Sequence, residues 1–175
     1  MLYGVVDESV RNQIVAQIPA FKAETDRFAK ASLLRRVSKS ADFARTTETE
    51  WLYDSVWSLF THFNQEYGFD LRGVEAPMQI MKYADGGCID WHIDDVNGTD
   101  KKSTCVRKLS MSIQLSAAED YSGGDFEFAG LSTDSFSRIV GTAICFPSYC
   151  VHRITPLTSG ERLSLLCFAL GPPFR

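Results

Sequence analysis

The sequence predicts a mainly β fold with helices (α+β), in which the helices come first. From Ala76 onward, short β-rich segments alternate with glycine, proline and aspartate at intervals typical of a sandwich or barrel. Before that point, apolar residues recur at three- and four-residue spacing between Trp51 and Phe63, which indicates an amphipathic helix. Such a helix is expected to cover one face of the sheet.

A chain of 175 residues is long enough for one core, so we expect a single domain over 1–175, with a helical lead-in at 1–75 and a β core at 76–175. The apolar fraction of 45% and the charged fraction of 23% are ordinary for a globular protein. A net charge of −4 and a pI near 5.4 argue against a nucleic-acid partner, because no large positive field is present.

The five cysteines form an odd number and no CxxC pair, which indicates reduced thiols and a cytoplasmic location. No apolar run reaches the roughly 18 to 20 residues that a membrane span needs, and the first residues lack the features of a signal peptide. We therefore expect no membrane association.

The first elements follow from local signals. Leu2 to Val6 is expected to form a strand, and Asp7 to cap a helix that runs up to Pro19. The charged and serine-rich segment 21–45 has no clear period and is expected to be a partly helical connection. Thr47 and Glu50 fit a capping box at the start of the amphipathic helix, which is expected to end near Gly68.

Seven strands are expected in the second half of the chain, at 77–84, 88–94, 106–117, 124–130, 139–146, 150–157 and 161–170. Asp85-Gly86-Gly87 supplies the residues that a tight turn between the first two strands requires. In 108–115, apolar and polar residues alternate. The polar face of this strand is expected either to meet water or to line a cavity inside a small barrel.

His92, Asp94 and His152 are the candidate metal ligands. Residues i and i+2 of a strand point the same way, so His92 and Asp94 can bind one ion, with a distant histidine as the third ligand. Two imidazoles and one carboxylate form the facial triad of non-heme Fe(II) oxygenases, which leaves positions open for oxygen and a cosubstrate. A zinc hydrolase could use the same three ligands.

Arg162 begins an apolar strand, where an unpaired guanidinium would cost several kcal/mol. An anion is therefore expected beside it, either an internal Asp or Glu or the carboxylate of a bound dicarboxylic acid. Ser164 lies on the same face of the strand and could add a hydroxyl to that carboxylate.

Taken together, these residues resemble the Fe(II)- and 2-oxoglutarate-dependent dioxygenases, in the prolyl 4-hydroxylase-like (PKHD-type hydroxylase) branch. The resemblance spans roughly Gln79 to Arg175. Its motifs are Tyr83-x2-Gly86-x5-His92-x-Asp94, Leu109-Ser110, Leu115-Ser116, Tyr121-x-Gly123-Gly124-Asp125, Gly141, Phe146-Pro147-Ser148, His152-x9-Arg162 and Gly171-Pro172.

The resemblance implies a double-stranded β-helix (jelly-roll) core with the N-terminal helices packed on one sheet. It implies hydroxylation of a substrate C–H bond, with 2-oxoglutarate decarboxylated to succinate. The cofactors would be Fe(II), held by His92, Asp94 and His152, with 2-oxoglutarate and O2 as cosubstrates and ascorbate as an additive. Arg162 would bind the far carboxylate of 2-oxoglutarate, with Tyr83, Ser164 and Gln114 as further contacts.

Two residues depart from the family pattern: Arg162 stands where many prolyl hydroxylases have lysine, and Ile89 where they often have an aromatic residue. A proline-containing peptide or protein is the expected substrate. The rival functions are modification of a small molecule or of alkylated nucleic acid, and a non-catalytic 2-oxoglutarate or metal sensor. Segment 94–106 could form a lid, Trp91 could line the cleft or pack outside the barrel, and Arg107 and Arg153 could touch substrate.

Overall fold

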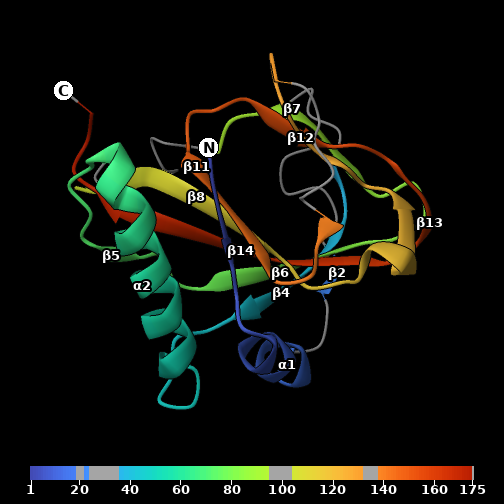
Figure 1. Cartoon of the computed structure of the whole chain (residues 1–175), viewed down its shortest axis with the longest axis horizontal. Helices are drawn as coiled ribbons and strands as arrows, with labels where there is room; N and C mark the ends of the chain where they lie inside the picture. The colour runs from blue at the N-terminus through green and yellow to red at the C-terminus, as the bar shows by residue number, and fades with distance from the viewer. Residues whose placement is uncertain (19–21, 24–35, 95–103, 132–137, 175) are drawn as a thin grey trace.

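Two antiparallel sheets enclose an interior, and two helices pack against the outer face of the larger sheet (Figure 1). The computed structural model describes residues 1–18, 22–23, 36–94, 104–131 and 138–174. The helices are α1 (Glu8–Ala16) and α2 (Glu50–Tyr67). The strands are β1 (Leu2–Val5), β2 (Lys22–Ala23), β3 (Arg36–Val37), β4 (Lys39–Phe43), β5 (Gly73–Val74), β6 (Met78–Tyr83), β7 (Cys88–His92), β8 (Val106–Gln114), β9 (Tyr121–Gly123), β10 (Phe126–Phe128), β11 (Thr142–Pro147), β12 (His152–Ile154), β13 (Leu157–Gly160) and β14 (Arg162–Gly171).

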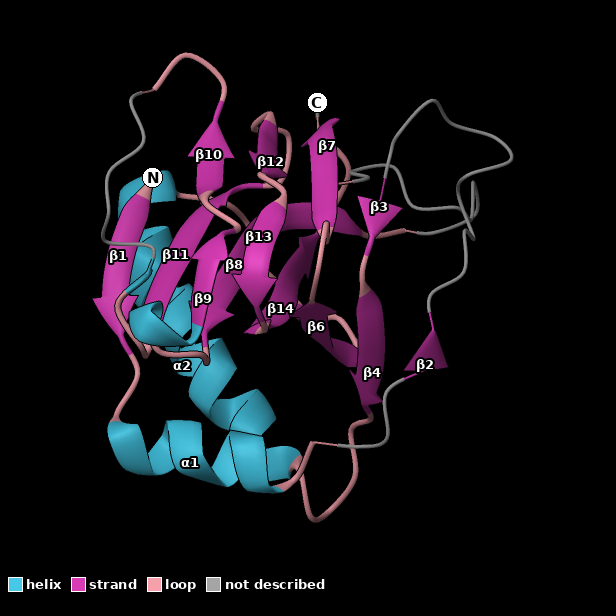
Figure 2. Ribbon diagram, turned by 90° about the vertical axis from the view of Figure 1, so that its right-hand side faces the viewer, coloured by secondary structure: helices cyan, strands magenta, loops and turns pink. Residues whose placement is uncertain are grey.

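The larger sheet has the strand order β1-β11-β8-β14-β6-β4-β2, with β5 added beside β14, and the smaller sheet has the order β10-β12-β7-β3. A separate ladder joins β9 and β13 (Figure 2). Neighbours in the sheets are distant in sequence, and every described pairing is antiparallel. The expectation of a mainly β chain with helices is confirmed.

Both helices form where local signals predict them. Asp7 caps α1 by accepting a hydrogen bond of 2.8 Å from the Ser9 amide, and Gly68 ends α2 in the left-handed conformation with φ of 68°. The predicted capping box is wrong, because α2 has Thr49 as its N-cap residue and Glu50 pairs with Arg45 instead. The arginine competes successfully for the carboxylate that a capping box would need.

The helical expectation for 21–45 is wrong wherever the structure describes this segment, since it contributes β2, β3 and β4. In β4, Ala41 and Phe43 are buried in the core and the backbone pairs with β6. Pairing with a neighbouring strand decides that this segment is extended. The local pattern of apolar residues does not show such pairing. The lead-in at 1–75 therefore supplies strands to the larger sheet as well as the two helices.

The two faces of β8 serve different parts of the molecule. Leu109, Met111 and Ile113 pack in the core beneath the helices. The polar residues that alternate with them, Lys108, Ser110, Ser112 and Gln114, are also buried. The polar face therefore does not meet water, and the interior alternative holds for this strand.

The turn at Asp85-Gly86-Gly87 carries the chain between the sheets. Gly86 has the expected positive φ, 70°. However, β6 belongs to the larger sheet and β7 to the smaller one, so the two strands form a corner and not a hairpin. The corner places Tyr83 and His92 on opposite walls of the interior.

All five cysteines are free thiols. Across the described part of the chain, neither helix has the length and apolar character required to traverse a bilayer.

Candidate functional site

His92 and His152 lie directly opposite each other, at the end of β7 and the start of β12. In each residue, Nδ1 lies close to the carbonyl oxygen two positions earlier: 2.8 Å from Asp90 O and 3.0 Å from Cys150 O. Because a carbonyl oxygen can only accept, Nδ1 must carry the hydrogen in both rings. In the neutral ring, Nε2 is then the unprotonated nitrogen, which is the atom that can bind a metal.

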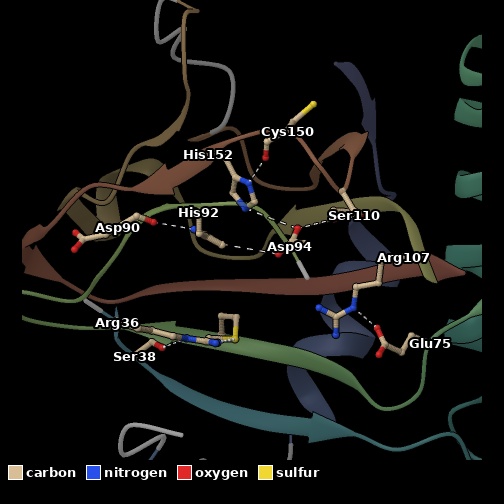
Figure 3. Close-up of polar contacts among 12 residues, drawn as sticks. Arg36, Ser38, Glu75, Asp90, His92, Asp94, Arg107, Ser110, Cys150 and His152 are labelled. Atoms are coloured by element: carbon tan, nitrogen blue, oxygen red, sulfur yellow. Dashed lines mark hydrogen bonds and ion pairs between the residues drawn. The ribbon is translucent and has the colours of Figure 1, made fainter. Parts of the chain in front are cut away.

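Asp94 completes the group from a position just beyond the end of β7. Its Oδ1 lies 3.9 Å from His92 Nε2, and its Oδ2 lies 3.8 Å from His152 Nε2. One ligand atom from each of the three residues lies within 4.8 Å of the others, and Figure 3 shows the side chains pointing toward a common space. Since β7 ends at His92, strand alternation alone does not place Asp94.

The donor set fits a single divalent ion. Two donor atoms that each lie about 2.1 Å from one ion are at most about 4.2 Å apart. Each histidine nitrogen is within this limit of one oxygen of Asp94, at 3.9 Å from Oδ1 for His92 and 3.8 Å from Oδ2 for His152. Two nitrogens and one oxygen on one side of an ion leave its other positions open, as in a facial triad. The chemistry and clustering of these residues therefore suit a divalent ion such as Fe(II).

The surroundings keep the site largely dry. Side-chain exposure is 16% for His92, 8% for Asp94 and 5% for His152, so His92 is the most accessible of the three. The His152 ring packs against Phe126 and Phe146, with centroid distances of 5.3 and 4.8 Å. Burial, followed by the proximity of His152, lowers the pKa of His92. The ring is thus kept neutral and available as a ligand.

The four residues predicted to bind the cosubstrate lie together on adjacent strands of the larger sheet. Arg162 and Ser164 belong to β14, where Arg162 is the register partner of Tyr83 in β6 and Ser164 that of Gln114 in β8. All four are buried. Alternation along β14 places Arg162 and Ser164 on the face away from the helices, because Leu165 and Cys167 fill the helix side.

Arg162 is a buried cation with unused donor capacity. Only 2% of the residue is exposed, and its Nη1 has no hydrogen-bond partner among the described residues. Its guanidinium carbon lies 5.6 Å from the centre of the Tyr83 ring. No acid in the described ranges forms an ion pair with it, so the internal-acid alternative finds no support there. A buried, under-satisfied guanidinium is a site for an anion.

Gln114 is predicted to make a further polar contact with the cosubstrate. Its Nε2 donates to Ser116 O at 2.9 Å and to the Tyr121 hydroxyl at 3.0 Å, while its buried Oε1 has no partner among the described residues. The side chain therefore offers an acceptor to the interior, which suits a donor and not a carboxylate.

Several other residues now have defined places. Trp91 lies on the outer face of the smaller sheet, where the Arg153 guanidinium stands 4.5 Å from its ring and pairs with Glu127. Trp91 therefore packs outside the barrel. Arg107 pairs with Glu75 at 2.6 Å. The suggested lid at 94–106 falls mostly on residues 95–103, which lie outside the described residues.

Sequence reasoning assigned no role to three residues near the triad. Ser110 and Ser148 contact each other and Asp94. In the sequence they belong to the motifs shared with the family, but no role is predicted for them. Arg36 of β3 reaches into the interior, with Nη2 at 3.4 Å from Met81 Sδ, and its charge is one of the causes that lower the pKa of His92. An arginine in a segment of unclear period carried no signal that could have identified it.

Comparison of sequences identifies the family of this site. Residues 78–170 match the model of the 2OG-Fe(II) oxygenase superfamily. A PKHD-type hydroxylase from Hyphomonas neptunium is 26% identical over 166 residues, which cover 93% of this chain and 73% of the relative. Other PKHD-type hydroxylases match over about half of this chain and about two fifths of their own length.

Solved structures share the fold. A viral collagen prolyl hydroxylase from Paramecium Bursaria Chlorella virus-1, in complex with 2OG, superposes with a TM-score of 0.68 at 18% identity, covering 98% of this chain and 97% of that one. A prolyl hydroxylase from Trichoplax adhaerens, in complex with a hypoxia inducible factor peptide fragment, gives 0.69 at 16% identity, covering 95% and 82%. The double-stranded β-helix expected from the sequence is confirmed.

Proposed function

Because the chain belongs to the 2OG-Fe(II) oxygenase superfamily, in its prolyl 4-hydroxylase-like branch, we propose that it hydroxylates a prolyl residue of a peptide or protein. It is a 2-oxoglutarate-dependent dioxygenase, and its cofactors are Fe(II) and 2-oxoglutarate, with O2 as cosubstrate. The observation that carries the proposal is the buried, under-satisfied Arg162 in the same inter-sheet interior as the three clustered ligands.

His92, Asp94 and His152 would hold the iron through Nε2, a carboxylate oxygen and Nε2. When bound, Fe(II) with 2-oxoglutarate and O2 supplies the oxidising chemistry that converts a C–H bond to a hydroxyl and releases succinate and carbon dioxide. The protein contributes two imidazoles that are oriented by Asp90 O and Cys150 O through their Nδ1 atoms. It also contributes apolar packing, because the rings of Phe126 and Phe146 lie against His152.

Arg162 would bind the far carboxylate of 2-oxoglutarate, since its guanidinium can form two parallel hydrogen bonds to a carboxylate. Tyr83 and Ser164 would lie beside that carboxylate, because they flank Arg162 on the adjacent strand and two residues along its own strand. Gln114 would act differently, holding the Tyr121 hydroxyl in place through its amide.

A peptide substrate is supported by two observations. The relatives are hydroxylases of the PKHD type, and the Trichoplax adhaerens neighbour was solved with a bound peptide fragment. In this chain, His92 is the most exposed of the three ligand side chains, at 16%. Ile89, where prolyl hydroxylases often have an aromatic residue, is buried in the inter-sheet core opposite Ile154. The departure at this position therefore changes the interior of the barrel and not its exposed surface.

The test is succinate release by purified protein supplied with Fe(II), ascorbate and 2-oxoglutarate. Proline-containing peptides should stimulate release, and mass spectrometry should find one added oxygen on proline. Asp94→Ala should abolish the activity, whereas Asp54→Ala, at an exposed position of α2, should retain it. Stimulation only by free amino acids or by alkylated oligonucleotides would exclude the prolyl substrate. Equal turnover by Asp94→Ala would overturn the metal assignment itself.

A further inference from the structure

Asp94 is held in place by two serines and not by a strand. Its backbone N–H donates to Ser148 O at 3.0 Å, and its Oδ2 accepts a hydrogen bond of 2.5 Å from the Ser110 hydroxyl. The Ser110 and Ser148 hydroxyl oxygens are in turn 2.9 Å apart. Because β7 ends two residues earlier, at His92, these contacts are what orient the carboxylate.

The three side chains form a chain of contacts, which we call the relay. The Ser110 hydroxyl donates to Asp94 Oδ2, and the same hydroxyl contacts Ser148 Oγ. The Ser148 hydroxyl therefore reaches the carboxylate through Ser110. Both serines are 0% exposed, so water does not compete for these bonds.

The relay belongs to the larger sheet, whereas Asp94 follows a strand of the smaller one. Ser110 lies in the middle of β8, between Phe146 of β11 and Phe168 of β14. Ser148 follows β11, and its N–H donates to Lys108 O of β8 at 3.1 Å. Two well-paired strands thus provide a rigid base for a ligand that has little secondary structure of its own.

We propose that Ser110 is a positioning residue for the metal ligand Asp94 and that Ser148 acts through it. The hydroxyl of Ser110 occupies one lone pair of Oδ2 and fixes the rotation of the carboxylate before the metal arrives. This inference rests on the proposed metal site and deepens it. Removal of an outer hydrogen-bond partner of a metal ligand typically weakens metal binding by 10- to 100-fold.

The experiment measures the dissociation constant of Mn(II) alone, without 2-oxoglutarate or O2, together with the visible absorption spectrum of the Co(II)-loaded protein. Ser110→Ala should raise the Mn(II) dissociation constant by about 10- to 100-fold and alter the Co(II) bands. Ser110→Thr, which keeps a hydroxyl, should restore both. The matched control is Ser112→Ala, at a buried serine on the same face of β8 that makes none of the Asp94 contacts, and it should change neither.

The relay predicts that the effects of the two serines are not additive. Ser148→Ala should weaken Mn(II) binding less than Ser110→Ala, and should add little in the Ser110→Ala background, because its hydroxyl acts only through Ser110. Additive effects would refute the relay. If Ser110→Ala does not fold, Ser148→Ala still reports through the Co(II) bands, and unchanged bands would overturn the proposal.

Failure of this inference can be told apart from failure of the proposed function. If Asp94→Ala binds Mn(II) as tightly as the wild type, the metal site itself is wrong. If Asp94→Ala loses Mn(II) while Ser110→Ala retains wild-type affinity and wild-type Co(II) bands, the metal site stands and only the positioning role is lost.

Discussion

The rings of His92 and His152 face each other across the β7–β12 pair, with centroids 4.2 Å apart and planes inclined at 49°. Two imidazoles this close cannot both be protonated without repulsion, and burial adds to the cost of charging His92. The arrangement favours a neutral His92 ring, which is the form needed to bind a divalent metal.

The lowered pKa of His92 predicts how the stability of the metal-free protein depends on pH. The pKa lies below its ordinary value of about 6.5 in the folded state, so between the two values the unfolded chain binds more protons. The free energy of unfolding should therefore fall as the pH is lowered below about 6.5. Urea unfolding from pH 7.5 to 5 checks this, and His92→Gln should show a shallower fall. An identical pH dependence in the variant would contradict the explanation.

Removal of the Arg162 side chain should separate cosubstrate binding from folding. Arg162→Met is expected to weaken 2-oxoglutarate binding by at least about 30-fold, ~2 kcal/mol, because the carboxylate loses its charged partner. The unfolding free energy of the metal-free protein should stay equal or rise, since an under-satisfied buried cation is removed. Calorimetric titration with Mn(II) present and urea unfolding test the two parts.

The matched control for Arg162→Met is Arg72→Met, at an exposed arginine whose nearest acid, Asp70, is 3.8 Å away. It should alter neither quantity measurably. Arg162→Lys should recover part of the 2-oxoglutarate affinity but not all of it, because an ammonium cannot form the two parallel bonds. Full affinity in Arg162→Met would remove Arg162 from the cosubstrate site.

Gly124 lies against the side chains of Leu157 and Arg162, with no room for a side chain of its own. A Cβ at this position would lie 3.3 Å from Arg162 Cδ and would overlap Leu157, and the backbone φ is +65°. Gly124→Ala should therefore destabilise the protein by about 2–4 kcal/mol and also weaken 2-oxoglutarate binding.

Gly130→Ala is the control for Gly124→Ala, because φ is +79° there but, among the described residues other than its chain neighbours, no atom lies within 4 Å of the added Cβ. It should cost about 1–2 kcal/mol from the backbone conformation alone and leave 2-oxoglutarate affinity unchanged. Thermal unfolding and calorimetry distinguish the two variants. Equal losses of 2-oxoglutarate affinity in both would show that the space beside Arg162 is not the cause.

Tyr53 joins α2 to the ends of two strands. Its buried hydroxyl donates to Phe43 O of β4 at 2.7 Å and accepts from Met78 N–H of β6 at 3.2 Å. Tyr53→Phe should lower the unfolding free energy by about 1–3 kcal/mol, because both backbone groups lose their partner in the core. Tyr149→Phe, at an exposed ring, should change it by less than about 0.5 kcal/mol. Urea unfolding of both variants is the measurement.

The elements that local signals control were predictable. Asp7 and Gly68 are where the helix ends require them, and the strands from Met78 onward follow the spacing of turn residues. The prediction for the segment from Phe21 to Arg45 was wrong, because β4 and β3 depend on pairing with β6 and β7, which are distant in sequence. The short β9 and β13 were missed for the same reason, since they pair only with each other.

For the site, the amino-acid sequence determined which chemistry was available: two histidines, one aspartate and an arginine at spacings typical of one family. The tertiary structure decided the rest. It brought His92 opposite His152, placed the Ser110 hydroxyl on Asp94 and left the Arg162 guanidinium under-satisfied among the described residues. Residue types and local spacing set the kind of bond that each group can form. The distances and the burial that decide which bonds do form arise only when strands far apart in the chain are packed together.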